Sequence, residues 1–243
     1  MADRLPSAAV VLGARNLGAA LVGDLVARGV RTATVARTRA DLDDLRRLGA
    51  VAIAADAADP EELGAALARA ADAIGPPELI VNATSPTRPA NDRAGFGGGP
   101  IVSATEEALA TWAFPLARQA VVFLNAAARA LDGRKGTLIQ VTGAPARRTN
   151  PERGIVSAGM SAVRALTHAA AQELRECGIH VALLIVDGII ESPKTAAMAR
   201  HLPREALVRH EDVADAVHFL ATQSPRGITH ELLITPVGGR WVP

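Results

Sequence analysis

Apolar residues follow two alternating patterns along the chain, and the first pair sets the template for the rest. Ala8–Leu12 is an uninterrupted apolar run, and Ala19–Arg28 carries apolar residues at helical spacing before Gly29. A run without alternation is typical of a strand covered on both faces, whereas 3.6-residue spacing indicates a helix that buries one face. The start of the chain therefore predicts a buried parallel strand followed directly by a helix.

The same alternation repeats to the end of the chain, with seven strands and six helices in turn. The chain therefore predicts an α/β fold: a Rossmann-like, doubly wound, parallel seven-stranded sheet with helices on both faces, as one domain over residues 1–243. The further expected strands are Thr32–Ala36, Ala50–Ala54, Leu79–Val81, Thr137–Thr142, His180–Val186 and Glu231–Thr235. The further expected helices are Arg39–Leu48, Pro60–Ile74, Ala104–Leu131 with a bend near Pro115, Ile155–Cys177 and Glu211–Ala221.

One segment, residues 84–100, interrupts this alternation. It reads TSPTRPANDRAGFGGGP, and its prolines and glycines are incompatible with a regular helix or strand. Loops of this length in compact domains are usually functional or inserted. We expect either a mobile lid or a tolerated insertion.

Composition narrows the class of protein. The chain has 243 residues, a formal net charge of +1 and one cysteine, Cys177. No apolar run reaches the roughly 18 residues of a membrane span, and the opening MADRLPSAAVV lacks a signal-peptide layout, so we expect a cytoplasmic protein without a membrane partner. The single cysteine and the six scattered histidines show no metal-ligand spacing, so we expect no metal site. Near-neutral charge and the scarcity of aromatic residues argue against a nucleic-acid partner.

The glycine turn after the first strand is the first candidate site. Gly13 and Gly18 flank ARNL, and the following helix offers backbone N–H donors and the positive end of its dipole. This turn can hold a pyrophosphate, although Gly-x4-Gly differs from the usual dinucleotide fingerprint and also suits an ordinary tight turn.

A second candidate is Arg37, which follows the second strand where an acid would select NAD. A cation there accommodates the 2′-phosphate of NADP. Together with Arg15 it favours NADP(H), the alternative being that both arginines are merely solvated. In a doubly wound sheet the ligand lies beyond the carboxyl ends of the strands. The residues expected at this edge are Gly13, Arg37, Asp56, Asn82, Thr142 and Asp187.

The order of these landmarks resembles the short-chain dehydrogenase/reductase superfamily over nearly the whole chain. The landmarks are the glycine turn, Ala55–Asp56, the LIVNA segment at residues 79–83, the GTLIQVT strand and the helix VSAGMSAVRALTHAAAQEL. The segments GIHVALLIVDGIIESPKT and SPRGITHELLITPVGGRW resemble a divergent branch of that superfamily. The resemblance implies that NADP(H) contacts Gly13, Arg15, Asn16, Leu17, Gly18, Arg37, Asp56, Asn82, Ala83, Asp187 and Ile189.

The catalytic positions implied by the resemblance carry the wrong residues. The serine, tyrosine and lysine positions hold Gly143, Val156 and Met160, and the asparagine position holds Gln119 or Arg118, depending on the alignment. A phenol becomes useful near neutrality when an adjacent ammonium favours its anion, and valine and methionine supply neither group. The chain contains no tyrosine at all.

Other polar residues are weaker candidates, chosen by position alone. Thr142 could bind a carbonyl, and Lys194 is the one lysine on the ligand side, since Lys135 enters the fifth strand at its opposite end. Arg147, Arg148 and Glu191 could polarise a substrate carbonyl, although loop solvation or strand-end capping explains each of these candidates better.

Two functions remain open at this stage. The protein is either an NADP(H)-dependent oxidoreductase for a small-molecule substrate or a cofactor- or ligand-binding protein without that chemistry. The resemblance also implies a homodimer or homotetramer joined through helices 104–131 and 155–177, where Ala126–Ala128 and Ala169–Ala171 would allow close helix approach.

Overall fold

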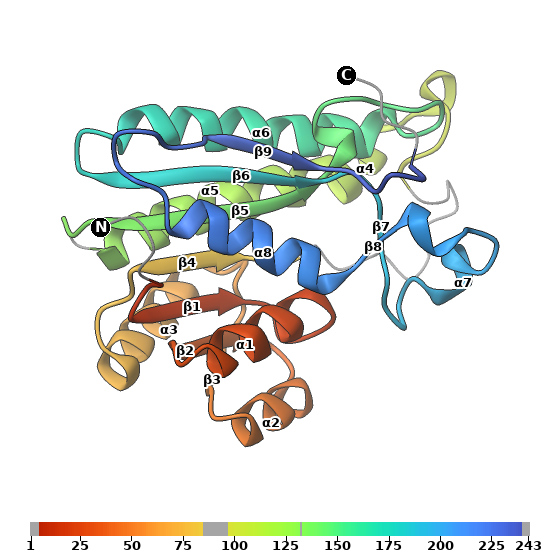
Figure 1. Ribbon diagram of the computed structural model, residues 1–243. Helices are drawn as coiled ribbons and strands as arrows, with labels where there is room; N and C mark the ends of the chain where they lie inside the picture. Colours follow the sequence, from red (N-terminus) through yellow and green to blue (C-terminus); the bar gives the residue numbers. More distant parts are fainter. Residues whose placement is uncertain (1–4, 85–96, 132, 240–243) are drawn as a thin grey trace.

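The computed structural model describes residues 5–84, 97–131 and 133–239, and a seven-stranded sheet runs through the molecule (Figure 1). The strand order is β3-β2-β1-β4-β5-β6-β9, and every neighbouring pair is parallel. This confirms the predicted doubly wound sheet. The strands are β1 Ala8–Leu12, β2 Arg31–Ala36, β3 Val51–Ala54, β4 Leu79–Asn82, β5 Gly136–Gly143, β6 Ile179–Val186 and β9 Glu231–Ile234.

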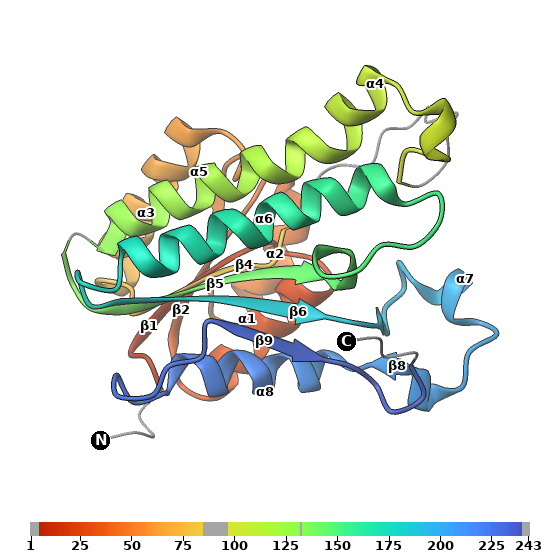
Figure 2. The same cartoon turned by 90° about the horizontal axis from the view of Figure 1, so that it is seen from above.

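Helices cover both faces of the sheet (Figure 2), and an apolar core lies between the sheet and each layer of helices. Alternate residues of β1 explain why: Val10 and Leu12 join one core with α3, α5 and α6, while Val11 joins the other with α1, α2 and α8. Both faces of the sheet are therefore covered by apolar side chains, as the strands without polar alternation predicted. The helices are α1 Leu17–Ala27, α2 Arg39–Arg47, α3 Pro60–Ile74, α5 Phe114–Leu131, α6 Gly154–Glu173 and α8 His210–Ala221.

The strand order reverses between β1 and β4. Their carboxyl ends and those of β2, β5 and β6 open on the same edge, on the right in Figure 1. This edge is where a doubly wound sheet binds its ligands, because the connecting segments diverge there to opposite faces. We call it the ligand edge.

Several elements differ from the sequence prediction. The expected helix 104–131 is split into α4 (Glu106–Ala108), a π-helical turn (Leu109–Ala113) and α5, because Pro115 lacks the N–H that a regular helix would use. The helix α6 ends at Glu173, four residues before the predicted end. A small parallel pair, β7 (Ile189–Ile190) and β8 (Leu207–Val208), was not predicted.

Most of the segment predicted as a lid or insertion, residues 85–96, lies outside the described residues. Its end is described: Gly97, Gly98 and Gly99 all have positive φ, and Gly97 accepts a 3.3 Å hydrogen bond from the amide of Val156. The glycine run therefore rests against the start of α6. Within the described ranges, no helix combines the length and the apolar character needed to cross a bilayer.

Candidate active site

The turn between β1 and α1 is so tight that position 18 has no space for a side chain. A Cβ at this position would lie 2.4 Å from the carbonyl oxygen of Gly13. Gly13 itself has φ 115°, and its amide donates to Val35 while its carbonyl accepts from Thr34. The two glycines therefore hold the start of α1 directly against the end of β1.

The start of α1 suits an anion. Asn16 precedes the helix with φ 47° and, among the described residues, provides no side-chain cap for α1; the first turn of the helix also carries no acid. The amide of Gly18 donates to the carbonyl of Arg15 at 3.0 Å, and the dipole of α1 favours a phosphate group at this end. Phosphate binding by Gly13, Asn16, Leu17 and Gly18 stays a prediction.

The two predicted phosphate-binding arginines lie next to acids. The Arg15 Nε atom is 3.4 Å from Asp41 in the first turn of α2, and the Arg37 Nη1 atom is 4.0 Å from Asp56 beyond β3. Both guanidinium groups are exposed, and Asp56 also accepts a 2.9 Å bond from the amide of Ala58. The structure places Arg37 and Asp56 together, so a ligand phosphate at Arg37 must share that cation with a carboxylate.

A polar chain runs across the carboxyl ends of β4 and β5. The Asn82 amide nitrogen donates to Gln140 at 3.0 Å, and the Asn82 oxygen accepts from Thr84 at 2.5 Å. Gln119 on α5 donates in turn to the Thr84 hydroxyl. This hydrogen-bond network favours Gln119 over Arg118 at the position that the resemblance gives to asparagine. Gln119 faces the ends of β4 and β5, whereas Arg118 donates to the carbonyl of Ala58.

An apolar wall occupies the positions at which the resemblance implies catalytic side chains. Val156 is buried in a cluster with Trp112 and Ile155, and Met160 packs against that cluster. The Met160 sulfur lies 3.8 Å from where a Cβ of Gly143 would stand. The structure thus brings Gly143, Val156 and Met160 together, and in them it places no group able to transfer a proton.

An ion pair between the partly buried Arg148 and the buried Asp187, which sequence reasoning missed, lies near the end of β5. The Arg148 Nη2 atom donates to Asp187 Oδ1 at 2.6 Å, and the Thr235 hydroxyl approaches Asp187 Oδ2 at 3.5 Å. Asp187 follows β6, one position beyond the residue that pairs with Gly143. Arg148 and Asp187 were each predicted at this edge, but 39 residues separate them and nothing in the sequence indicated that they meet.

The remaining predicted residues are spread along the ligand edge. Thr142 is half-buried near the end of β5, Ile189 begins β7, and Ala83 follows β4 with its amide donating to Leu12. Lys194 and Glu191 are exposed in the segment after β7. Among the described residues, Lys194 makes no hydrogen bond or ion pair that would mark it as catalytic, so that role stays a prediction.

Arg147 points away from the site, toward a charge cluster on β9. Its Nε atom is 3.5 Å from Glu231, which also binds Arg164 at 2.6 Å and His168 at 2.9 Å. Burial raises the pKa of Glu231, but the hydrogen bond and charge of Arg164, helped by His168 and Arg147, outweigh it and lower that pKa overall. Arg147 therefore belongs to a structural cluster.

The fold and the strand order define an α/β protein of the Rossmann type. Residues 11–238 match the family model described as enoyl-(acyl carrier protein) reductase. The chain belongs to this family, within the short-chain dehydrogenase/reductase superfamily.

Solved structures share the fold at low sequence identity. The NADPH-bound structure of a short chain oxidoreductase from Pseudomonas aeruginosa PAO1 containing an atypical catalytic center is 22% identical, with TM-score 0.81, over 97% of this chain and 98% of that one. A blue fluorescent protein from a metagenomic library, in complex with NADPH, is 24% identical, with TM-score 0.73, over 95% and 96%. A point variant of actinorhodin polyketide ketoreductase with NADPH is 21% identical, with TM-score 0.76, over 97% and 98%.

Proposed function

We propose that this protein is an NADP(H)-dependent oxidoreductase that acts on a small molecule without a serine, tyrosine and lysine set. The observation that carries the proposal is the Gly13–Gly18 turn, which sets an uncapped helix start against the end of β1 with Arg37 nearby. These residues fit a dinucleotide phosphate. The NADPH-bound proteins of the same fold support this choice of cofactor.

Bound NADP(H) supplies or accepts a hydride, and the protein must then stabilise charge on the substrate. The apolar wall of Val156 and Met160 excludes water from one side but transfers no proton. Thr142 and Lys194 remain the proposed polar contacts to substrate, with solvent water as the proton source. Turnover by this route should be slow, because a positioned acid or base typically contributes about 10²–10⁴-fold to the rate.

A second function is favoured by one specific observation. Val156, at the position that the resemblance gives to the catalytic tyrosine, packs into a buried cluster with Trp112 and Ile155. A site closed in this way suits a protein that binds NADP(H) as a sensor, scaffold or partner subunit and leaves it unreacted. The two functions share the cofactor site and differ only in turnover.

The test is a titration of the purified protein with NADPH and with NADH, followed by a panel of carbonyl substrates. Binding with NADPH oxidation supports the oxidoreductase, whereas binding without oxidation supports the second function. If neither nucleotide binds, both are wrong.

Two glycine variants localise the cofactor. Gly18→Ala should weaken NADPH binding about tenfold or more, because the new Cβ meets the Gly13 carbonyl and forces the helix start outward. Gly23→Ala, in the same helix, is the matched control, since its Cβ would meet only Leu48 at 3.8 Å. Equal NADPH affinities for the two variants would place the nucleotide elsewhere.

We also propose a homodimer or homotetramer assembled through α5 and α6. Most of the alanines that the sequence suggested for this contact face the core of the protein. Ala126, Ala127, Ala170 and Ala171 are buried. The exposed faces carry instead Phe114 and Val121 on α5, and Ala158, Ala165 and Ala169 on α6. Light scattering that shows a monomer at micromolar concentration would contradict this assembly.

A further inference from the structure

The polar chain across the ends of β4 and β5 has one direction, because all of its hydrogen-bond donors are turned the same way. From α5, Gln119 donates to the Thr84 hydroxyl, and that hydroxyl donates to the Asn82 oxygen. The Asn82 amide nitrogen donates to Gln140, and Gln140 donates to the carbonyl of Val141 at 2.9 Å. The four side chains therefore form a single row of donors that starts on a helix and ends inside the sheet.

Two backbone groups fix this direction. A carbonyl oxygen only accepts, so Gln140 must turn its Nε2 atom toward Val141 and its Oε1 atom toward Asn82. A backbone amide only donates, so the Asn82 oxygen must face Thr84, whose amide nitrogen lies 3.2 Å away. The Thr84 hydroxyl therefore gives its single proton to Asn82 and can only accept a proton from Gln119.

The polar chain also holds the backbone that faces the glycine turn. A Cβ on Gly13 would lie 3.3 Å from the carbonyl oxygen of Ala83 and 3.7 Å from the amide nitrogen of Thr84. The Ala83 amide donates to Leu12 at 3.0 Å. The peptide between Ala83 and Thr84 is thus held by β1 on one side and by the polar chain on the other, and it borders the turn at which the nucleotide is proposed to bind.

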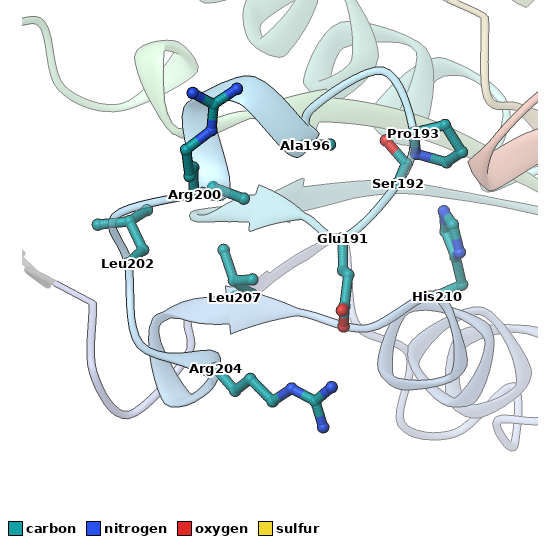
Figure 3. A pocket seen from close by; sticks show the side chains of 10 residues that line it. Glu191, Ser192, Pro193, Ala196, Arg200, Leu202, Arg204, Leu207 and His210 are labelled. Carbon is teal, nitrogen blue, oxygen red and sulfur yellow. The ribbon is translucent and has the colours of Figure 1, made fainter.

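The polar chain differs from the side chains of the segment between β7 and α8. There, Arg200 and Arg204 are exposed, they extend from separate sides of the segment, and their guanidinium groups point apart (Figure 3). In the polar chain, by contrast, Asn82 and Gln140 are buried and Thr84 is half-buried. A change at one member of the polar chain is therefore passed directly to the next.

We propose that Gln119 is a positioning residue for the cofactor and acts through Thr84. Its amide donates to the Thr84 oxygen while the Thr84 proton goes to Asn82, and this arrangement holds the Ala83–Thr84 peptide against the glycine turn. Position 119 therefore requires a donor, because an acceptor there would compete with Asn82 for one proton. The inference rests on the proposed NADP(H) binding and adds to it a residue that need not touch the nucleotide.

The first experiment turns the donor at position 119 into an acceptor. Gln119→Glu keeps nearly the same shape, and NADP⁺, which survives mild acid, is titrated calorimetrically into the full chain from pH 5 to pH 8. At pH 8 the carboxylate only accepts, so the variant should bind NADP⁺ about tenfold more weakly than the parent protein, the loss expected for one hydrogen bond. Toward pH 5 this deficit should shrink, because an acceptor beside a carboxyl group raises its pKa above the reference value of about 4.3 and the protonated group donates again.

Neutral variants exclude the added charge as the cause. Gln119→Met removes the donor without adding charge, and should weaken NADP⁺ binding by a similar factor at every pH. Thr84→Val removes the hydroxyl at nearly constant shape and should weaken binding as much, whereas Thr84→Ser keeps the hydroxyl and should bind NADP⁺ as the parent protein does. In the double variant Gln119→Met with Thr84→Val the two losses should not add, since the residues share one hydrogen bond.

The matched control is Gln172→Glu, because Gln172 is exposed near the C-terminal end of α6 and should leave NADP⁺ affinity unchanged. The inference is wrong if Gln119→Met and Thr84→Val bind NADP⁺ as the parent protein does, or if the deficit of Gln119→Glu stays constant down to pH 5. A fall in melting temperature that follows the loss of affinity across the variants would show a purely structural role and would also overturn it. If the parent protein itself binds no nucleotide, the proposed function fails, and the inference fails with it.

Discussion

The two halves of the ligand edge differ in the side chains that they carry. At the ends of β1 and β2 lie a tight glycine turn, a helix start without a side-chain cap, and two exposed arginines beside carboxylates. At the ends of β5 and β6, the wall of Val156 and Met160 is apolar, and Arg148 and Asp187 are paired with each other. The fold can form without a bound cofactor and without proton-transfer groups, so cofactor binding and chemistry can be lost separately.

The largest expected effect is on the free energy of unfolding, and it tests whether the Arg148–Asp187 ion pair stabilises the fold. Arg148→Met leaves the Asp187 carboxylate, 5% exposed, without its ionic partner. Removing one member of a buried pair costs about 3–5 kcal/mol of the free energy of unfolding. Chemical denaturation of the variant measures this loss.

Two companion variants make that measurement specific. Arg148→Met with Asp187→Leu should recover most of the stability, because an apolar pair replaces the buried charges at little net cost. Arg47→Met, at an exposed helix pair with Asp44, should change unfolding by less than about 1 kcal/mol. A small effect of Arg148→Met alone would show that water reaches Asp187 and that this half of the edge is more open than its burial indicates.

The next effect concerns the missing proton donor. Gly143→Ser, Val156→Tyr and Met160→Lys together should raise carbonyl reduction by about a hundredfold or more, the usual contribution of a positioned acid. Serine fits, since a Cβ at Gly143 meets its nearest neighbours at 3.5 and 3.8 Å. Tyrosine is harder to place, because Val156 is packed against Trp112, and we expect about 1–3 kcal/mol of destabilisation.

The control for this gain differs by one oxygen. The same triple variant with Val156→Phe has the ring and the lysine but no phenol, and should show no gain in NADPH oxidation. Equal activity of the two variants would mean that the tyrosine hydroxyl is not what the site lacks.

The sequence predicted the sheet well because each strand is an unbroken apolar run between turn residues. It also placed Gly13, Arg37, Asn82 and Asp187 on one edge, since parallel strands end together. It did not predict the pairing of Arg148 with Asp187, or Trp112 beside Val156, because these contacts depend on how loops and helices pack over long separations. The β7–β8 pair was missed because two-residue strands carry no periodic signal.

A smaller effect sharpens the cofactor half. If Arg37 binds the 2′-phosphate, NADPH should bind more tightly than NADH by about 1.5–3 kcal/mol, and Arg37→Ala should remove most of that difference. The Asp56 carboxylate, 4.0 Å from Arg37, competes with the phosphate, so Asp56→Asn should widen the difference. Arg47→Ala, at the opposite end of α2, is the control. Equal affinities of the parent protein for NADPH and NADH would contradict the assignment.

The smallest effect separates the pH dependence of stability from that of the site. Burial lowers the pKa of His180, with the Thr229 carbonyl opposing this and the charge of His230 adding to it. Because the folded pKa lies below the unfolded value of about 6.5, the unfolded chain binds more protons, and stability falls as the pH drops below about 6.5. His180→Gln should reduce the change in melting temperature between pH 5 and 7. His201→Gln, at an exposed residue, should leave that change as it is in the parent protein.

His180 lies at the amino end of β6, opposite the ligand edge, and its ring meets that of His230 at 6.0 Å. Its titration should therefore change thermal stability without changing NADPH affinity, while turnover, lacking a phenol, should show no rise as the pH approaches 10. If NADPH affinity falls with the melting temperature in the parent protein but not in His180→Gln, the two ends of the sheet are coupled. The separation of binding from fold stability would then be wrong.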